Sequence, residues 1–136
     1  MYRIFLVAIF LWELPQNILG IIVWVLFRHK ISKAEILHGR LFFQTKGFGV
    51  SLGSFIFWSE SVFETAPNIP RIKAHEYGHA IQSLIFGPLY LILVGIPSFS
   101  RFFYSSFYYR FSKTGWKNYY KGYPENWADK LGMKYL

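Results

Sequence analysis

His75-Glu76-Tyr77-Gly78-His79 is the stretch that decides what this chain of 136 residues is built around. On a helix, a spacing of four residues places both imidazoles on one face, one turn apart. Two neutral imidazoles so arranged can hold one Zn²⁺, with Glu76 beside them to take a proton from a water molecule. The pattern predicts half of a zinc site. The alternative is a helix with two surface histidines and an unrelated glutamate.

The residues around this motif favour a helix over residues 69–86. Asn68 is a favourable N-cap, Pro70 suits the first helical turn, and Gly87-Pro88 is a strong stop signal. The motif would then lie in the middle of the helix, where the two histidines share a face.

A catalytic zinc site usually has three protein ligands, so the motif needs a partner. The chain has no cysteine, which excludes thiolate ligands, and the acidic residues downstream are Glu125 and Asp129. Pro124 predicts the start of a helix over residues 124–135, with both carboxylates one turn apart on one face. We expect Glu125 to bind the metal and Asp129 to accept the remaining ring N–H of a zinc-bound histidine. The alternative is an amphipathic tail whose N-terminus is stabilised by Glu125.

HEYGH followed by ENWAD resembles the gluzincin metallopeptidases, whose pattern is H-E-x-x-H followed by E-x-x-x-D. The E-x-x-A-D form is similar to that of the HtpX-type membrane metalloproteases, which are much longer chains. The resemblance implies a zincin-like motif helix with Glu76 as catalytic base. It also implies zinc ligands and a positioning carboxylate at His75, His79, Glu125 and Asp129.

The composition indicates a membrane protein. Hydrophobic residues make up 53% and aromatic residues 22% of the chain, and a chain of this length cannot bury so much apolar surface. The surplus must face lipid or a partner. Residues 4–27 would span about 36 Å as a helix, enough for the hydrocarbon core of a bilayer.

A polar break, Glu13-Leu14-Pro15-Gln16-Asn17, interrupts this transmembrane segment. It leaves two interpretations, a single span kinked at Pro15 or a pair of short helices that enter and return. We favour the kinked span, because neither half alone is long enough to cross. Glu13 is then either a functional group or a residue that holds the break together by hydrogen bonds, and we favour the second role.

The second apolar stretch, residues 87–103, contains glycine and proline and fits either a span or a re-entrant segment. Basic residues at 28, 30 and 33 follow the first segment, which places the bulk of the chain in the cytoplasm by the positive-inside rule. Residues 82–98 resemble those of small bacterial membrane proteins with the same HEYGH. We therefore expect a bacterial inner-membrane protein with a cytoplasmic active site.

Residues 36–59 are rich in strand formers, and Lys46-Gly47-Phe48-Gly49 in their middle is typical of a turn. The pattern predicts a β-hairpin of residues 36–44 with residues 50–58. In gluzincins a strand upstream of the motif helix binds extended substrate by β-addition, and this hairpin could act in that way. The alternative is a hairpin that only covers the motif helix.

Taken together, the sequence predicts a single domain over residues 1–136, a mainly α membrane protein with a small β-hairpin. The expected function is that of a zinc-dependent metallohydrolase, a metallopeptidase that cleaves peptide or membrane-protein substrates with Glu76 as base. A tyrosine such as Tyr120 or Tyr123 is a candidate to stabilise the oxyanion. The oligomeric state is left open.

Two other classes of function compete with this interpretation. The first is a non-catalytic membrane protein that acts through a partner and has a structural zinc site, closed by a fourth ligand such as His38. The second is a basic, aromatic, membrane-disrupting peptide, which accounts for the net charge of +8 but not for the two motifs. Basic and aromatic residues alternate near the C-terminus, which suits lipid headgroups, and we expect no nucleic-acid partner.

Overall fold

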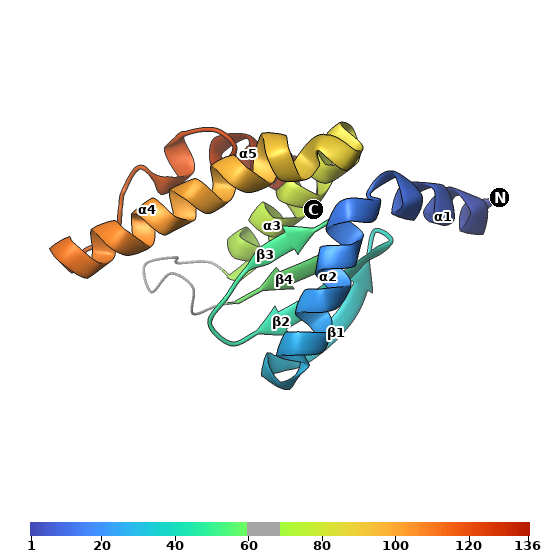
Figure 1. Ribbon diagram of the computed structural model, residues 1–136, viewed down its shortest axis with the longest axis horizontal. Helices are drawn as coiled ribbons and strands as arrows, with labels where there is room; N and C mark the ends of the chain where they lie inside the picture. Colours follow the sequence, from blue (N-terminus) through green and yellow to red (C-terminus); the bar gives the residue numbers. More distant parts are fainter. Residues whose placement is uncertain (60–68) are drawn as a thin grey trace.

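The computed structural model describes residues 1–59 and 69–136, which are mainly helical with one small mixed sheet (Figure 1). The helices are α1 (Tyr2–Trp12), α2 (Leu14–Phe27), α3 (Ile69–Phe86), α4 (Ile96–Ser112) and α5 (Glu125–Tyr135). The strands are β1 (Ile31–Leu37), β2 (Arg40–Thr45), β3 (Val50–Leu52) and β4 (Phe55–Trp58). Short helical turns lie at Arg28–Lys30, Gly87–Leu89, Leu91–Gly95 and Tyr119–Lys121.

The motif helix and the C-terminal helix form where the sequence predicts them. Helix α3 covers the predicted residues 69–86, and α5 begins one residue after Pro124. Pro70 lies in the first turn of α3, where its missing N–H leaves no hydrogen bond unmade. The predicted N-cap, Asn68, lies outside the described residues.

The predicted hairpin of residues 36–44 with 50–58 is wrong. The strand order is β1-β2-β4-β3, in which β2 and β4 run parallel, and β1 and β3 are antiparallel to their neighbours. The chain reverses at Gly39 and again at Gly53, and both glycines have positive φ (74° and 63°). That conformation favours glycine, and Gly47 adopts it too (φ 91°), where the chain reverses between β2 and β3. These two strands do not pair with each other, because β4 lies between them.

The inner strands of the sheet, β2 and β4, are buried on both faces, which explains why β4 is an unbroken apolar run. Alternate residues of a strand point to opposite faces. One face packs against α3 in a cluster of Phe42, Ile56, Trp58, Ile72 and Ala80. On the other face, residues of the N-terminal helices pack against Phe43, Phe55 and Phe57. The sheet thus lies between α2 and α3 (Figure 1).

The N-terminal apolar segment forms two helices that meet at 89°, so it is not a single gently kinked rod. The break lies at Glu13, and Pro15 falls within the first turn of α2. Glu13 accepts a hydrogen bond from Arg40 of β2 at 2.6 Å, and both side chains are buried. Gln16 donates to the Ser83 hydroxyl and to the Gly87 carbonyl, each at 2.9 Å. The polar break thus fastens α2 to the sheet and to the end of α3.

Among the described helices, none is by itself long and apolar enough to cross a bilayer. The bent pair of α1 and α2 reaches the necessary length and apolarity only when its two members are taken together. The second apolar stretch, residues 87–103, is divided between two helical turns and the first half of α4, which continues to Ser112. A membrane-spanning role for either segment stays a prediction.

Candidate metal centre

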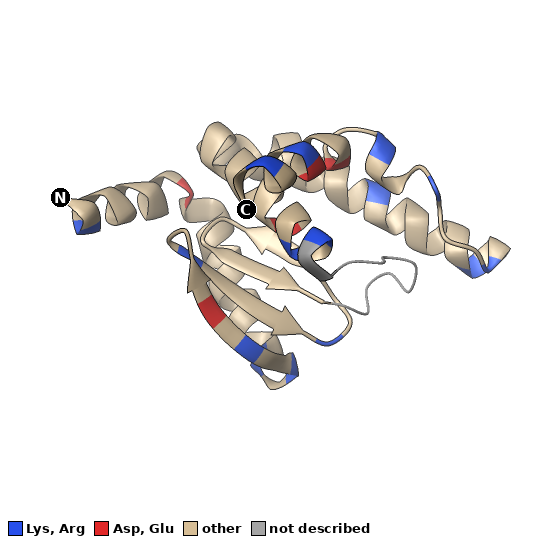
Figure 2. Cartoon of the chain, turned by 180° about the vertical axis from the view of Figure 1, so that it is seen from behind, with Lys and Arg blue, Asp and Glu red and all other residues tan. Residues whose placement is uncertain are grey.

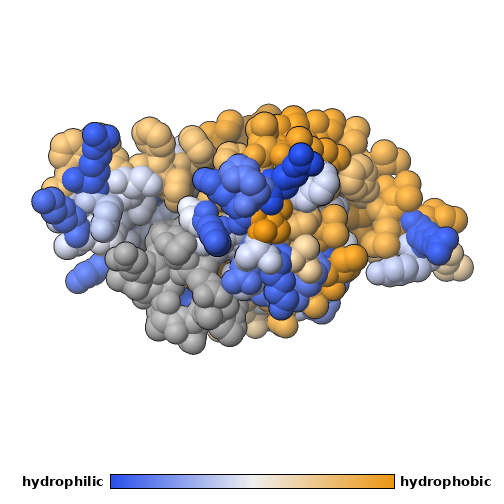
Figure 3. All heavy atoms as spheres, turned by 90° about the horizontal axis from the view of Figure 1, so that it is seen from below, coloured by the Kyte–Doolittle hydropathy of each residue, from blue (hydrophilic) through white to orange (hydrophobic). Residues whose placement is uncertain are grey.

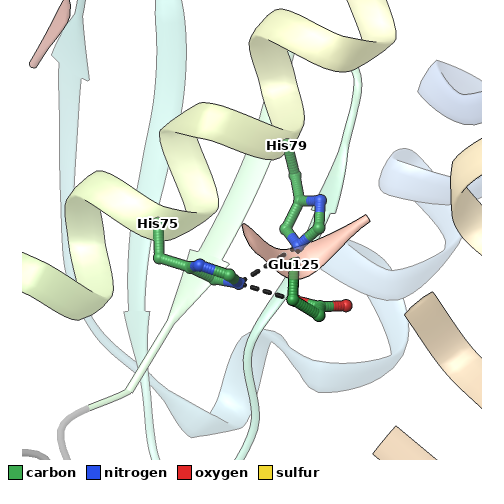
Figure 4. A group of neighbouring side chains, drawn as sticks. All are labelled: His75, His79 and Glu125. Atoms are coloured by element: carbon green, nitrogen blue, oxygen red, sulfur yellow. Dashed lines mark hydrogen bonds and ion pairs between the residues drawn. The ribbon is translucent and has the colours of Figure 1, made fainter. Parts of the chain in front are cut away.

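The two motif histidines and Glu125 point to one spot between α3 and α5 (Figure 4). The Oε2 atom of Glu125 lies 2.8 Å from Nε2 of His75 and 3.1 Å from Nε2 of His79, and the two Nε2 atoms are 3.2 Å apart. All three side chains are buried. The structure thus brings together the three ligands that the sequence predicts.

Small residues let the two helices approach closely enough for this convergence. A Cβ atom on Gly78 would lie 1.8 Å from the carbonyl oxygen of Ala128, and one on Gly132 would lie 1.8 Å from that of Ala74. Only residues without a Cβ fit at these two positions. Gly78, inside the motif, therefore sets the distance between α3 and the helix that begins with Glu125.

Each histidine is held by a partner on its other ring nitrogen. Nδ1 of His75 lies 3.1 Å from Oδ1 of Asp129, whose other oxygen accepts from Arg71 at 2.9 Å. This is the position that the sequence predicts for Asp129. Nδ1 of His79 lies 2.8 Å from Oε1 of Gln82. With a metal bound, Nδ1–H would donate in both rings, and both Nε2 lone pairs would face the centre, as metal binding requires.

Sequence reasoning missed two of these supporting residues. Gln82 lies on α3 three residues after His79, and its amide also donates to the Pro124 carbonyl at 3.0 Å. The sequence signal that could have identified Gln82 is an amide side chain one helical turn after a predicted ligand. Ser98 of α4 donates to Oε1 of Glu125, which leaves Oε2 for the centre. No local pattern marks Ser98, because the contact is made only in the folded chain.

Glu76 lies beside the centre and is ready to accept a proton. Its side chain is partly buried, and the Oε2 atom is enclosed and has no hydrogen-bond partner among the described residues. Burial raises the pKa of the Glu76 carboxyl, while the neighbouring His79 and His75 lower it. A Cβ on Gly49 would lie 3.1 Å from Oε1, so a residue without a side chain makes room for this carboxylate.

The charges at the centre suit a cation. Burial raises the pKa of the Glu125 carboxyl, but the hydrogen bonds from His75 and His79 outweigh it and hold that pKa below its usual value. Burial lowers the pKa of His75, and the hydrogen bonds to Asp129 and Glu125 overcome this and raise it to about 9. Surroundings that favour a proton on an imidazole also favour a metal ion in its place. Two imidazoles and a carboxylate are a donor set that zinc accepts.

Of the other residues that the sequence suggests for the site, His38 and Tyr123 have partners elsewhere, and Tyr120 lies close to the centre. His38 is at the β1–β2 turn, where its ring lies 5.4 Å from that of Tyr77, and it does not belong to the described metal-ligating group. It is therefore not the fourth ligand that the rival interpretation needs. The hydroxyl of Tyr123 donates to the Leu93 carbonyl at 2.5 Å, so this hydroxyl is engaged outside the metal-binding group. Tyr120 remains close, with its ring edge-on to His75 at 5.0 Å.

Comparisons of the chain with protein-family models, with curated proteins and with solved structures find no match. The resemblance to gluzincins therefore rests on the residues of the two motifs. What the structure adds is that those motifs, 46 to 54 residues apart in sequence, meet in space at hydrogen-bonding distance.

Proposed function

We propose that this protein is a zinc-dependent metallohydrolase that cleaves peptide bonds. The observation that carries the proposal is the convergence of His75, His79 and Glu125, whose ligand atoms lie within 4.8 Å of one another, next to a Glu76 carboxylate whose Oε2 atom is buried. The described residues supply three protein ligands here. A catalytic site keeps a position open for water, whereas a structural site is closed by a fourth protein ligand.

Zinc held there would supply a Lewis acid and make a water molecule more acidic at neutral pH. Glu76 would take the proton of that water and pass it to the leaving amine. Asp129 and Gln82 would hold the two imidazoles in the tautomer that leaves Nε2 free, and Ser98 would hold the Glu125 carboxylate.

The neighbourhood of β3 supports a peptide as the substrate. Within the described sheet β3 is an edge strand, and its residues line the cavity that contains Glu76. An extended peptide could pair with this edge by β-addition, the binding mode that the resemblance to gluzincins implies. The Tyr90 hydroxyl donates a hydrogen bond to the Ser51 carbonyl oxygen at 3.0 Å. A substrate N–H could still donate to the same oxygen, because a carbonyl oxygen has two lone pairs.

Attachment to a bilayer is part of the same proposal. Helix α1 has no buried residue although it is apolar after Arg3, and the outward face of α2 is exposed and apolar as well. Figure 2 shows most Lys and Arg on β1, α5 and the far end of α4, and one basic residue at the start of α1. We place the chain in a bacterial inner membrane with the centre on the cytoplasmic side. Release of the full chain by carbonate at high pH, without detergent, would count against this.

The hydrolase proposal is tested by Glu76→Gln, with Glu35→Gln as a matched control. Glu35 is on β1, paired with Lys73, outside the residues that line the cavity. We expect both variants to bind one zinc per chain, because neither loses a ligand, and Glu76→Gln alone to lose hydrolysis of a peptide mixture read by mass spectrometry. Equal turnover by the two variants would remove Glu76 from the mechanism.

A further inference from the structure

The cavity beside the metal centre has apolar walls. It has a volume of about 520 Å³, and its walls come from α2, β3 and the segment from Leu91 into α4. Among the described residues that line it, Glu76 is the sole acid, and neither Lys nor Arg is present. A charged side chain brought into it would lose its water without gaining an opposite charge. The cavity therefore selects apolar groups.

The mouth of the cavity lies between α2 and α4. Leu19 of α2 and Phe99 of α4 line the cavity and are also 40% and 66% exposed, so they form its rim. The residues next to them on the outer faces, such as Ile22 and Phe103, are exposed and apolar too. Seen from below, hydrophobic residues predominate along the side of the molecule where α2 lies (Figure 3). A ligand reaches the cavity across apolar surface.

One polar atom in the wall indicates what kind of apolar ligand fits. The Ser51 hydroxyl is buried, lines the cavity and has no hydrogen-bond partner among the described residues. A buried hydroxyl without a partner costs free energy that a bound donor or acceptor recovers. A peptide backbone has such groups at every residue, whereas an acyl chain has none along its length.

We propose that this cavity binds an apolar segment of a membrane polypeptide, which enters in extended form between α2 and α4. Its side chains lie against Leu19 and Phe99, and its backbone meets β3 and the Ser51 hydroxyl. The inference names the substrate class of the metal centre and therefore rests on the proposed function.

Binding can be tested apart from hydrolysis, because the chain has no cysteine of its own. Leu19→Cys is made in the zinc-loaded Glu76→Gln protein, and Ile36→Cys, exposed on β1, is the matched control. The probe is a leucine-rich peptide with one pyridyl-disulfide cysteine, whose reaction releases a coloured thione. Each coupling rate is divided by the rate at which the same cysteine reacts with a small disulfide reagent. We expect this ratio to be about tenfold higher for Leu19→Cys than for Ile36→Cys, because the cavity concentrates the peptide.

Competition supplies the second readout of this experiment. An unlabelled leucine-rich peptide should suppress coupling at Leu19→Cys, and the same peptide with a central lysine should not. Equal coupling at the two cysteines, or equal competition by the two peptides, would overturn the inference whatever the protein hydrolyses.

The hydrolytic arm uses the otherwise unchanged full chain in liposomes. Leu19→Glu and Phe99→Glu should each lower kcat/KM for a leucine-rich membrane peptide by about tenfold or more, since a charge at the rim repels an apolar segment. Ile36→Glu should leave it unchanged, and zinc content should not move in any of the three. Faster cleavage of charged soluble peptides overturns the inference and leaves the hydrolase intact. Selective coupling without any cleavage overturns the hydrolase proposal instead.

Discussion

Gly78 lies against Ala128 so closely that a Cβ on the glycine would stand 1.8 Å from the alanine carbonyl oxygen. The contact joins the middle of the motif helix to the second turn of α5. Glu125 starts that helix three residues earlier, so its position relative to His75 and His79 depends on this contact. Gly78 thus acts on the metal centre without touching it.

Gly78→Ala should therefore weaken zinc binding although every ligand is still present. The added methyl must push α5 away, which we expect to destabilise the fold by about 1–3 kcal/mol, as overpacking does. It should also lower the zinc affinity, measured by competition with a chelator. Gly115→Ala is the control, because no atom lies within 4 Å of a Cβ at that glycine. Equal zinc affinity in the two variants would show that the contact does not position Glu125.

Glu125 and Asp129 should behave differently from each other. Glu125→Ala removes a ligand atom and should abolish most of the zinc binding. Asp129→Ala removes the partner of His75 Nδ1 and should cost about 10–100-fold in affinity or activity without eliminating the site. Zinc titration of both variants measures this. Negligible losses in both would mean that α5 only packs against α3.

Gln82 should affect the centre as strongly as Asp129 does. Gln82→Ala leaves Nδ1 of His79 without its acceptor and should cost about tenfold or more in zinc affinity. Gln82→Glu keeps an acceptor at the same place and should restore most of that loss, although it forfeits the bond to Pro124. If Glu fails to rescue and both variants melt early, Gln82 acts through the Pro124 contact alone.

Glu13 should matter for folding and not for hydrolysis. Arg40→Ala leaves the Glu13 carboxylate buried without its partner, which should cost about 3–5 kcal/mol of stability. The double variant Glu13→Leu with Arg40→Met removes both charges and should recover most of it. Chemical unfolding in detergent gives the stabilities. A loss of turnover in the double variant at unchanged stability and zinc content would instead assign Glu13 a functional role.

The sequence predicts the parts of this molecule that depend on neighbours along the chain. Gly87-Pro88 and Pro124 mark helix ends, and the spacing of the two histidines places them on one face of α3. The four-residue spacing of Glu125 and Asp129 works in the same way. These signals are local, so they predict the three side chains that converge, His75, His79 and Glu125.

The parts that depend on tertiary structure could not be predicted. Strand formers in residues 36–59 indicate strands but not their partners, and no local signal shows that β4 lies between β2 and β3 and pairs in parallel with β2. The contact of Ser98 with Glu125 joins two helices that no periodicity relates. The fixed partner of Glu13 is on β2, 27 residues away.

The most direct test of a catalytic zinc centre is the coordination of zinc in the purified full chain. We expect one zinc per chain, with X-ray absorption that fits two imidazole nitrogens, one carboxylate oxygen and one water oxygen, at about 2.0–2.2 Å. Folded wild-type protein that takes up no zinc under metal-replete conditions would contradict the account, and so would a fourth protein ligand in place of the water.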